Sequence, residues 1–272
     1  MLLSRLFLPA LCAAAALCAC SPAADDDEPA STTAVTTTSS GGMAAGGAGG
    51  QAGAAVAGFG GAGGSGAGEE LPLDGFGAIA GDCGVLSPVE LTSPSPYIFE
   101  NSIDFGSLPF DYTALSPGGQ EVYDDGNLGG SSLHSEIFSY EVLYRCELAL
   151  LLKTEGEIAY QDAGGAKTDL LVSVDELQTG VSVTRAYQYP PSEPYTVADA
   201  LALLEDKLAG VLESSANVAP ADGWPKQILH ILAYADEHAS SIAQAYLQVA
   251  PAIQADTIVL VTVTHGEDEF VY

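Results

Sequence analysis

Cationic residues are scarce in this sequence. Its 272 residues include 7 Lys and Arg against 36 Asp and Glu, which gives a formal net charge of −29. From residue 71 onward, 30 acidic residues face 6 basic ones, a net charge of about −24. Nucleic-acid binding gains most of its affinity from cations that neutralise phosphates. The composition therefore excludes a broad DNA- or RNA-binding face, and it disfavours binding to anionic membrane surfaces.

Several motifs of common active sites are also missing. The sequence has no C-x-x-C pair, so zinc and thiol-redox chemistry have little support. It has no G-x-S-x-G elbow, so nothing indicates a serine hydrolase. Its four His residues show no metal-ligand spacing, and no apolar run is long enough for a settled transmembrane helix. We therefore expect no cofactor.

The first twenty residues have the pattern of an export signal. Arg5 is their one charged residue, and residues 6–19 form an apolar run of signal-peptide length. The run ends in Leu17, Cys18, Ala19 and Cys20, which resembles the bacterial lipobox. The resemblance implies cleavage after a signal peptide of residues 1–19 and acylation of Cys20 with diacylglycerol and palmitate. The alternative is an ordinary secreted protein with a chance cysteine.

Export decides how the remaining cysteines are interpreted and where the protein resides. Past Cys20 the chain contains Cys83 and Cys146, and two cysteines in an oxidising compartment indicate one disulfide. The alternative is two separate buried thiols. Ser21, directly after the predicted lipidated residue, is compatible with sorting to the outer membrane. We expect an exported protein anchored there by its lipid.

Residues 20–70 are expected to be a tether. Residues 21–40 are polar, acidic and rich in Thr, and residues 41–68 are half glycine. Neither segment has enough apolar surface to offset the entropy of ordering. About 50 flexible residues span roughly 40 Å. Residues 71–272 then form a single globular domain, with a core of about residues 133–264.

The pattern of elements predicts an α/β domain. Up to about residue 132 the segment is rich in Pro and Gly, and we expect irregular structure there. A helix is expected at residues 133–155, followed by strands at 157–161, 169–175 and 180–186. Next come helices at 196–214, 224–233 and 240–249, and a buried strand at 256–264. This order predicts a mixed four-stranded sheet flanked by helices.

That order of elements resembles the core of the PD-(D/E)XK nuclease superfamily over about residues 135–264. The resemblance implies a glutamate on the first helix, for which Glu141 is the candidate, and a metal-binding aspartate at Asp169. It also implies an acid and a lysine on the third strand, but Ser182 and Thr184 occupy those positions. The pair that would hold Mg²⁺ or Mn²⁺ and orient water is thus incomplete.

Other residues would have to replace the missing pair. Arg185 on the same strand or Lys207 on the following helix would supply the cation. Each candidate also has a simpler interpretation. Glu141 forms an i,i+4 pair with Arg145, Asp169 starts a strand beside a turn, and Lys207 lies on a solvated helix face.

A second candidate pocket involves Trp224, Lys226 and His230. Lys226 and His230 are four residues apart and would share one face of the expected helix at 224–233. With Trp224 they would line a small-ligand pocket. The alternative is a packed helix end.

Three functions follow. The one we favour is a membrane-tethered lipoprotein whose nuclease-like domain binds a partner or has a structural role without catalysis. The first alternative is a metal-dependent phosphodiester hydrolase with a rearranged site. The second is a small-ligand binder or enzyme near residues 224–230. The sequence does not identify the protein or small molecule that would be the partner.

Overall fold

The structure, a computed structural model, describes residues 71–72, 77–128 and 130–272. They belong to the compact unit Gly53–Tyr272, whereas the other unit, Met1–Ala52, lies outside the described residues. The predicted signal peptide, Cys20 and the tether up to residue 70 also lie outside them and stay predictions. Within the described residues, no helix combines the length and apolar character needed to cross a bilayer.

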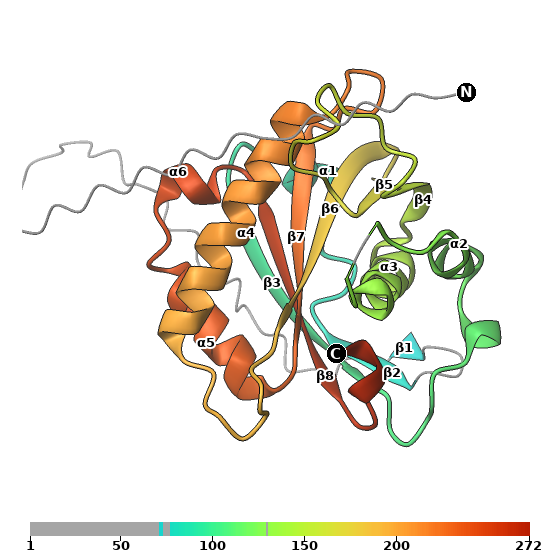
Figure 1. The fold of residues 1–272 in the computed structure, drawn as a ribbon, viewed down its shortest axis with the longest axis vertical. Coiled ribbons are helices and arrows are strands. Elements are labelled where there is room, and N and C mark those ends of the chain that lie inside the picture. Colours follow the sequence, from blue (N-terminus) through green and yellow to red (C-terminus); the bar gives the residue numbers. More distant parts are fainter. Residues whose placement is uncertain (1–70, 73–76, 129) are drawn as a thin grey trace, which may run out of the picture. The chain divides into compact units, whose positions relative to one another are not determined.

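A mixed sheet of eight strands forms the centre of the described residues (Figure 1). Its order is β1-β2-β3-β8-β7-β6-β5-β4. The neighbours β3, β8, β7 and β6 run parallel, and antiparallel strands extend the sheet at both edges. The strands are β1 (Leu71–Pro72), β2 (Ala78–Gly81), β3 (Tyr97–Asp104), β4 (Leu150–Thr154), β5 (Leu170–Val174), β6 (Leu177–Ala186), β7 (Lys226–Ala233) and β8 (Ile258–His265).

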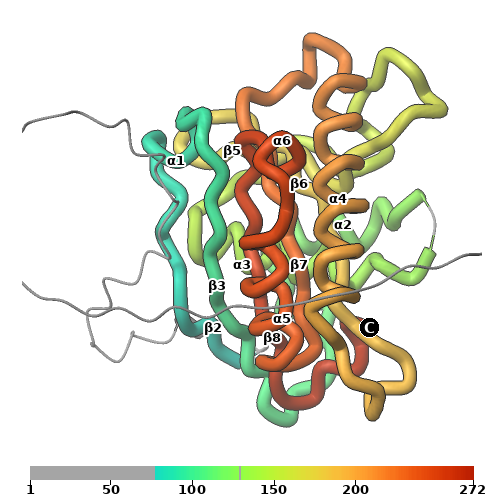
Figure 2. The backbone as a smooth tube through the Cα atoms, turned by 90° about the vertical axis from the view of Figure 1, so that its left-hand side faces the viewer, coloured from blue at the N-terminus to red at the C-terminus, as the bar shows by residue number. Residues whose placement is uncertain are grey.

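Helices cover both faces of this sheet. On one face α4 and α5 pack against the parallel strands, and on the other α3 packs with α2 beside it (Figure 1). Figure 2 shows α5 and α6 in front of the parallel strands, with α4 beside them and β2 and β3 to one side. The helices are α1 (Pro88–Thr92), η1 (Tyr112–Ala114), α2 (Pro117–Asp125), α3 (Leu133–Glu147), α4 (Val197–Asn217), α5 (Asp236–Tyr246), α6 (Pro251–Gln254) and η2 (Glu269–Val271).

The core therefore consists of two layers, one on each face. Side chains of β7 alternate between them: Ile228 and Leu232 join the layer under α3, while Leu229 and Ile231 join the layer under α4 and α5. Every residue of β7 is buried.

The predicted α/β class, a mixed sheet flanked by helices, is confirmed. The predicted strands at 169–175, 180–186 and 256–264 correspond to β5, β6 and β8. The expected start of the helix at Thr196 is also present, because its hydroxyl accepts the Asp199 N–H and the Asp199 carboxylate accepts the Thr196 N–H. The expected number of four strands is wrong, since the sheet has eight.

The helix predicted at residues 133–155 ends earlier. Leu148 takes a left-handed conformation with φ of 53°, which ends α3 and sends the chain back as β4. The strand predicted at 157–161 is wrong, since that segment forms just an isolated bridge at Tyr160. The apolar residues at 148–152 fit the spacing of a helix as well as that of a strand. The periodicity therefore placed the predicted end of the helix several residues too late.

Two further predictions of local structure are wrong. Residues 226–233, expected as part of a helix, form the strand β7. The segment before residue 132, expected to be irregular, contributes the strands β2 and β3 and the helix α2 to the fold. In β3 the Pro residues precede the strand instead of interrupting it, so they mark its start.

A disulfide ties the N-terminal segment to α3. Cys83 and Cys146 are joined, across a sequence separation of 63 residues. Beside the bond, the carboxylate of Glu147 accepts the backbone N–H groups of Gly84, Val85 and Leu86. A loop of this length corresponds to about 4 kcal/mol of stabilisation in the chain-entropy model. Of the two alternatives for the cysteines, the structure has the disulfide.

Candidate functional site

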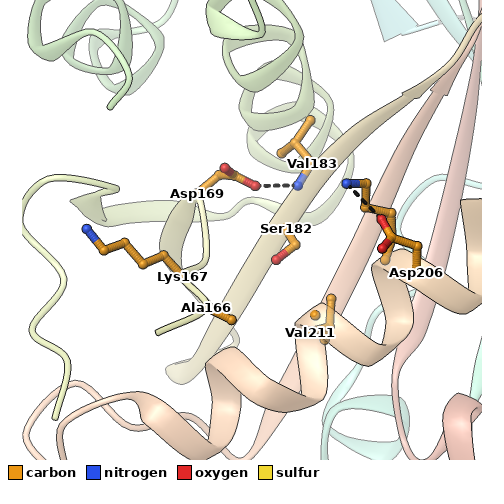
Figure 3. A pocket seen from close by; sticks show the side chains of 9 residues that line it. Ala166, Lys167, Asp169, Ser182, Val183, Asp206 and Val211 are labelled. Carbon is orange, nitrogen blue, oxygen red and sulfur yellow. Dashed lines mark hydrogen bonds and ion pairs between the residues drawn. The ribbon is translucent and has the colours of Figure 1, made fainter. Parts of the chain in front are cut away.

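A cavity of about 350 Å³ opens between β6, α4 and the segment before β5 (Figure 3). Its size is within the range of small-molecule sites. Asp169 lies on one wall, Ser182 and Val183 of β6 lie behind it, and α4 forms the opposite wall. The cavity is lined by Ala166, Lys167, Asp169, Ser182, Val183, Asp206, Lys207, Gly210 and Val211.

Asp169 is held by the antiparallel pairing of β5 and β6. Its own N–H donates to the carbonyl of Val181, and its Oδ2 accepts the N–H of Val183 at 2.6 Å. The Oδ1 atom has no hydrogen-bond partner among the described residues. Protein surrounds the side chain on most sides, yet part of its surface stays open to the cavity. One carboxyl oxygen is thus available to a ligand.

The surroundings of Asp169 make its carboxyl group a weak acid. Burial, and after it the nearby Glu136 carboxylate, raise the pKa of Asp169, which lies at about 7. The hydrogen bond from Val183 N–H and the positive charge of Lys207 act in the opposite direction. A perturbed carboxyl group that lines an open cavity is typical of functional sites.

Hydroxyl groups hold the floor of the cavity in place. Ser182 Oγ lies 3.1 Å from the hydroxyl of Thr168, which lies 3.3 Å from the hydroxyl of Ser214 on α4. Thr168 and Ser214 are buried, whereas Ser182 reaches the cavity. This chain links the start of β5, the middle of β6 and the end of α4. It fixes the distance between the two walls.

Lys207 brings positive charge to the cavity, and Lys167 lies at its edge. Lys207 Nζ lies 3.2 Å from Asp206, but both side chains are solvent-accessible, at 44% and 73%, so the pair contributes little. Lys167 has no hydrogen bond or ion pair within the described residues, and Figure 3 shows it extending away from Ser182. The domain's other cations have internal partners: Arg145, Lys153, Arg185 and Lys226.

Gly210 is an unusual residue for its place. It lies inside α4, where glycine costs roughly 0.5–1 kcal/mol relative to alanine. A Cβ atom at this position would meet no atom within 4 Å. No packing contact therefore requires glycine here, and its effect is to widen the cavity that it lines.

The structure brings together two of the four residues proposed from the nuclease resemblance. Asp169 and Lys207 line the cavity. Glu141 does not, because Ser116 and Arg145 bind both of its carboxylate oxygens. Arg185 also points elsewhere, toward Ser131 and the carbonyl of Val271. Glu141 and Asp169, which the hydrolase alternative requires in one site, therefore do not share this cavity, and the simpler interpretation of Glu141 as the partner of Arg145 is correct.

The prediction of a ligand pocket around Trp224, Lys226 and His230 is also wrong. Trp224 packs over Gly180 and donates its indole N–H to Ser215. Lys226 is fully buried on β7, and its ammonium group donates to the backbone carbonyls of Ser93 and Ser95.

His230 has a structural role in the core. It is fully buried between the hydroxyls of Ser139 at 2.7 Å and Thr262 at 2.7 Å. Burial lowers its pKa to about 3, so the ring is neutral. A neutral imidazole with both nitrogens hydrogen-bonded and no opening to solvent has no means of reaching a ligand.

The sequence reasoning missed Glu136, Lys167 and Gly210. Glu136, not Glu141, is the α3 carboxylate that acts on Asp169. The two glutamates are five residues apart and lie on different sides of the helix. The order of helices and strands does not indicate which of these two sides faces Asp169. The glycine inside a strongly periodic helix was the clearest available signal.

Among the described residues, one group of three acids has ligand atoms within 4.8 Å of one another: Glu121, Asp125 and Glu157. All three are exposed. Two of them already accept hydrogen bonds from Thr154. The group does not include Asp169, so it is unrelated to the metal site implied by the nuclease resemblance.

Comparisons with known proteins identify no family. No protein-family model matches the chain, and no solved structure matches it. The chain is similar to the "AAC-rich mRNA clone AAC4 protein" of Dictyostelium discoideum, with 39% identity over 162 residues. The match covers 57% of this chain and 23% of that protein, so the chain spans less than a quarter of the relative's length.

Proposed function

We propose that this chain is an exported lipoprotein, anchored to the outer membrane through Cys20, whose domain is a non-catalytic module that binds a small molecule. The cavity beside Asp169 carries the proposal. It combines an unpaired carboxyl oxygen, the weakly paired ammonium group of Lys207 and a glycine that keeps it open. Such convergence of polar groups on a concave site is the pattern expected of ligand binding.

Binding without catalysis is favoured over phosphodiester hydrolysis. Ser182 lines the cavity at the position where the nuclease-like pattern requires a metal-binding acid. Glu141, the other candidate ligand, is occupied by Ser116 and Arg145. The net charge of about −24 also repels a polyanionic substrate. Cleavage of DNA or RNA with Mg²⁺ or Mn²⁺, abolished by Asp169→Ala, would contradict this proposal.

Filling the cavity is expected to abolish binding without unfolding the protein. Gly210→Met would place a long side chain in the open space, whereas Gly210→Ala would add one methyl group. Both changes favour the helix and are expected to stabilise it by about 0.5–1 kcal/mol. Thermal shifts of the full-length protein would be measured with amino acids, ethylamine, acetate, inorganic phosphate, MgCl₂ and MnCl₂.

Wild type and Gly210→Ala should respond to the same probe, and Gly210→Met should not respond. A Met variant that is as stable as wild type and keeps the response would show that the cavity is not the binding site. The absence of a response in every variant would equally contradict the proposal.

Replacing the predicted acylated cysteine is expected to release the protein from membranes. In a bacterial host fed labelled palmitate, Cys20→Ser should lose the label and move to the soluble fraction, because one residue carries the anchor. Cys18→Ser is the matched control and should remain labelled. Equal labelling of the Cys20→Ser variant and wild type would show that the lipobox interpretation is wrong.

A further inference from the structure

The charges around the cavity are arranged in two zones. The unpaired Oδ1 of Asp169 lies in the zone formed by β5 and β6, against α3. The ammonium group of Lys207 belongs to α4, at the more exposed side, whereas Lys167 extends away from Ser182 (Figure 3). A ligand that satisfied just one zone would leave charged groups of the other zone without a partner.

The zone around Asp169 is negative. Glu136 of α3 and Glu155, which follows β4, both raise the pKa of Asp169, and Lys207 of α4 opposes them. Tyr160 also faces the carboxyl group. From β6 no charged side chain faces Asp169, because Arg185 binds Ser131 and Val271. Two acids against one lysine favour a cation beside Asp169.

The other zone is suited to an anion. Lys207 has Asp206 as its one ion-pair partner among the described residues, at an exposed position where a ligand can compete with it. The hydroxyl of Ser182 lies between the two zones and offers a donor or an acceptor.

We infer that the ligand of this cavity is a small zwitterion of the amino-acid type, whose ammonium group pairs with the ionised Asp169 carboxylate and whose carboxylate lies toward Lys207. This inference rests on the proposed binding function. An ammonium group supplies up to three donors and meets the free Oδ1 with a charge-assisted hydrogen bond. The volume of about 350 Å³ accommodates an amino acid with its side chain.

The inference has a distinctive consequence for protons. One pH unit below its pKa of about 7, Asp169 is mostly protonated in the free protein. Pairing with an ammonium group ionises it, so binding releases about 0.9 proton per ligand at that pH. A simple anion would instead favour the protonated carboxyl group and cause a small proton uptake, of at most about 0.1 proton at that pH. The sign of proton exchange therefore separates the two ligand classes.

Isothermal titration calorimetry of the full-length protein in buffers of different ionisation enthalpy tests this directly. Each common L-amino acid would be titrated in turn, with ethylamine as the cation-only probe and acetate and inorganic phosphate as anion-only probes. An amino acid should bind best and release protons. Ethylamine should bind at least about tenfold more weakly, with the same proton release.

Two variants test which side chain binds each charged group of the ligand. Asp169→Asn should weaken amino-acid binding by about tenfold or more and remove the proton release. Lys207→Gln should reduce amino-acid affinity to that of ethylamine while proton release persists. Each outcome differs from a general loss of structure, which would remove both signals together.

Proton uptake with acetate or phosphate as the best probe would overturn the zwitterion inference. So would binding of ethylamine that equals or exceeds that of every amino acid. In either case, if Gly210→Met abolishes the binding, the proposed binding function survives and just the ligand class is wrong. If no probe binds to wild type, both are wrong.

Discussion

Glu141→Gln is expected to lower the free energy of unfolding by about 3 kcal/mol, because it breaks a buried charge network. Glu141 is fully buried in α3. Its Oε1 accepts the N–H and the hydroxyl of Ser116, at 2.8 and 2.6 Å, and its Oε2 accepts from Arg145 at 3.1 Å. The amide of glutamine offers one acceptor oxygen, so its NH₂ group would face either the guanidinium donors or the Ser116 donors. Urea unfolding of the full-length protein measures the loss.

Ser116 is the N-cap residue of α2, so the effect should reach that helix. Glu205→Gln on α4, at an exposed position, is the control and should change stability by less than about 0.5 kcal/mol. Adding Arg145→Met to Glu141→Gln should cost less than the sum of the two single changes, because the partners share one network. An equal, small loss in Glu141→Gln and Glu205→Gln would contradict the buried network.

The elements predicted correctly from the sequence are those with one clear local pattern. The Thr196 and Asp199 capping box marks the start of α4, and the β-branched run at 256–264 marks β8. Errors arose where an apolar run suits a helix and a strand equally. In β7, Lys226 and His230 are four residues apart and share a face in either geometry. Sheet pairing decides such cases, and it depends on strands far away in the sequence.

The candidate site was predictable in part for the same reason. The thirteen-residue spacing from Asp169 to Ser182 follows from an antiparallel pair, and the structure has that pair in β5 and β6. The position of Lys207 opposite Asp169 depends on how α4 packs across the sheet. The order of helices and strands allows few such packing arrangements. Lys167 lies in a loop, where no periodicity indicates which way a side chain points.

Asp169 should make the protein less stable as the pH rises. Its pKa is about 7 in the folded state, against an ordinary value of 3.8. Between these two values the folded state binds more protons than the unfolded state, so stability falls with increasing pH. The contribution is fully present below the unfolded value and is lost above about pH 7. The full shift corresponds to about 4 kcal/mol, and water in the open cavity reduces it to roughly 2 kcal/mol.

Asp169→Asn is therefore expected to stabilise the ligand-free protein at about pH 8 by roughly 2 kcal/mol and to change stability little at about pH 3, below the unfolded pKa. The asparagine oxygen can still accept the Val183 N–H, and no charge has to be buried. Urea unfolding at several pH values measures the difference between the variant and wild type. Asp206→Asn, at the exposed side of the same cavity, is the control and should show no such dependence on pH. If Asp169→Asn destabilises the protein equally at both pH values, the carboxylate is paired in the native state, and the negative zone on which the zwitterion inference rests does not exist.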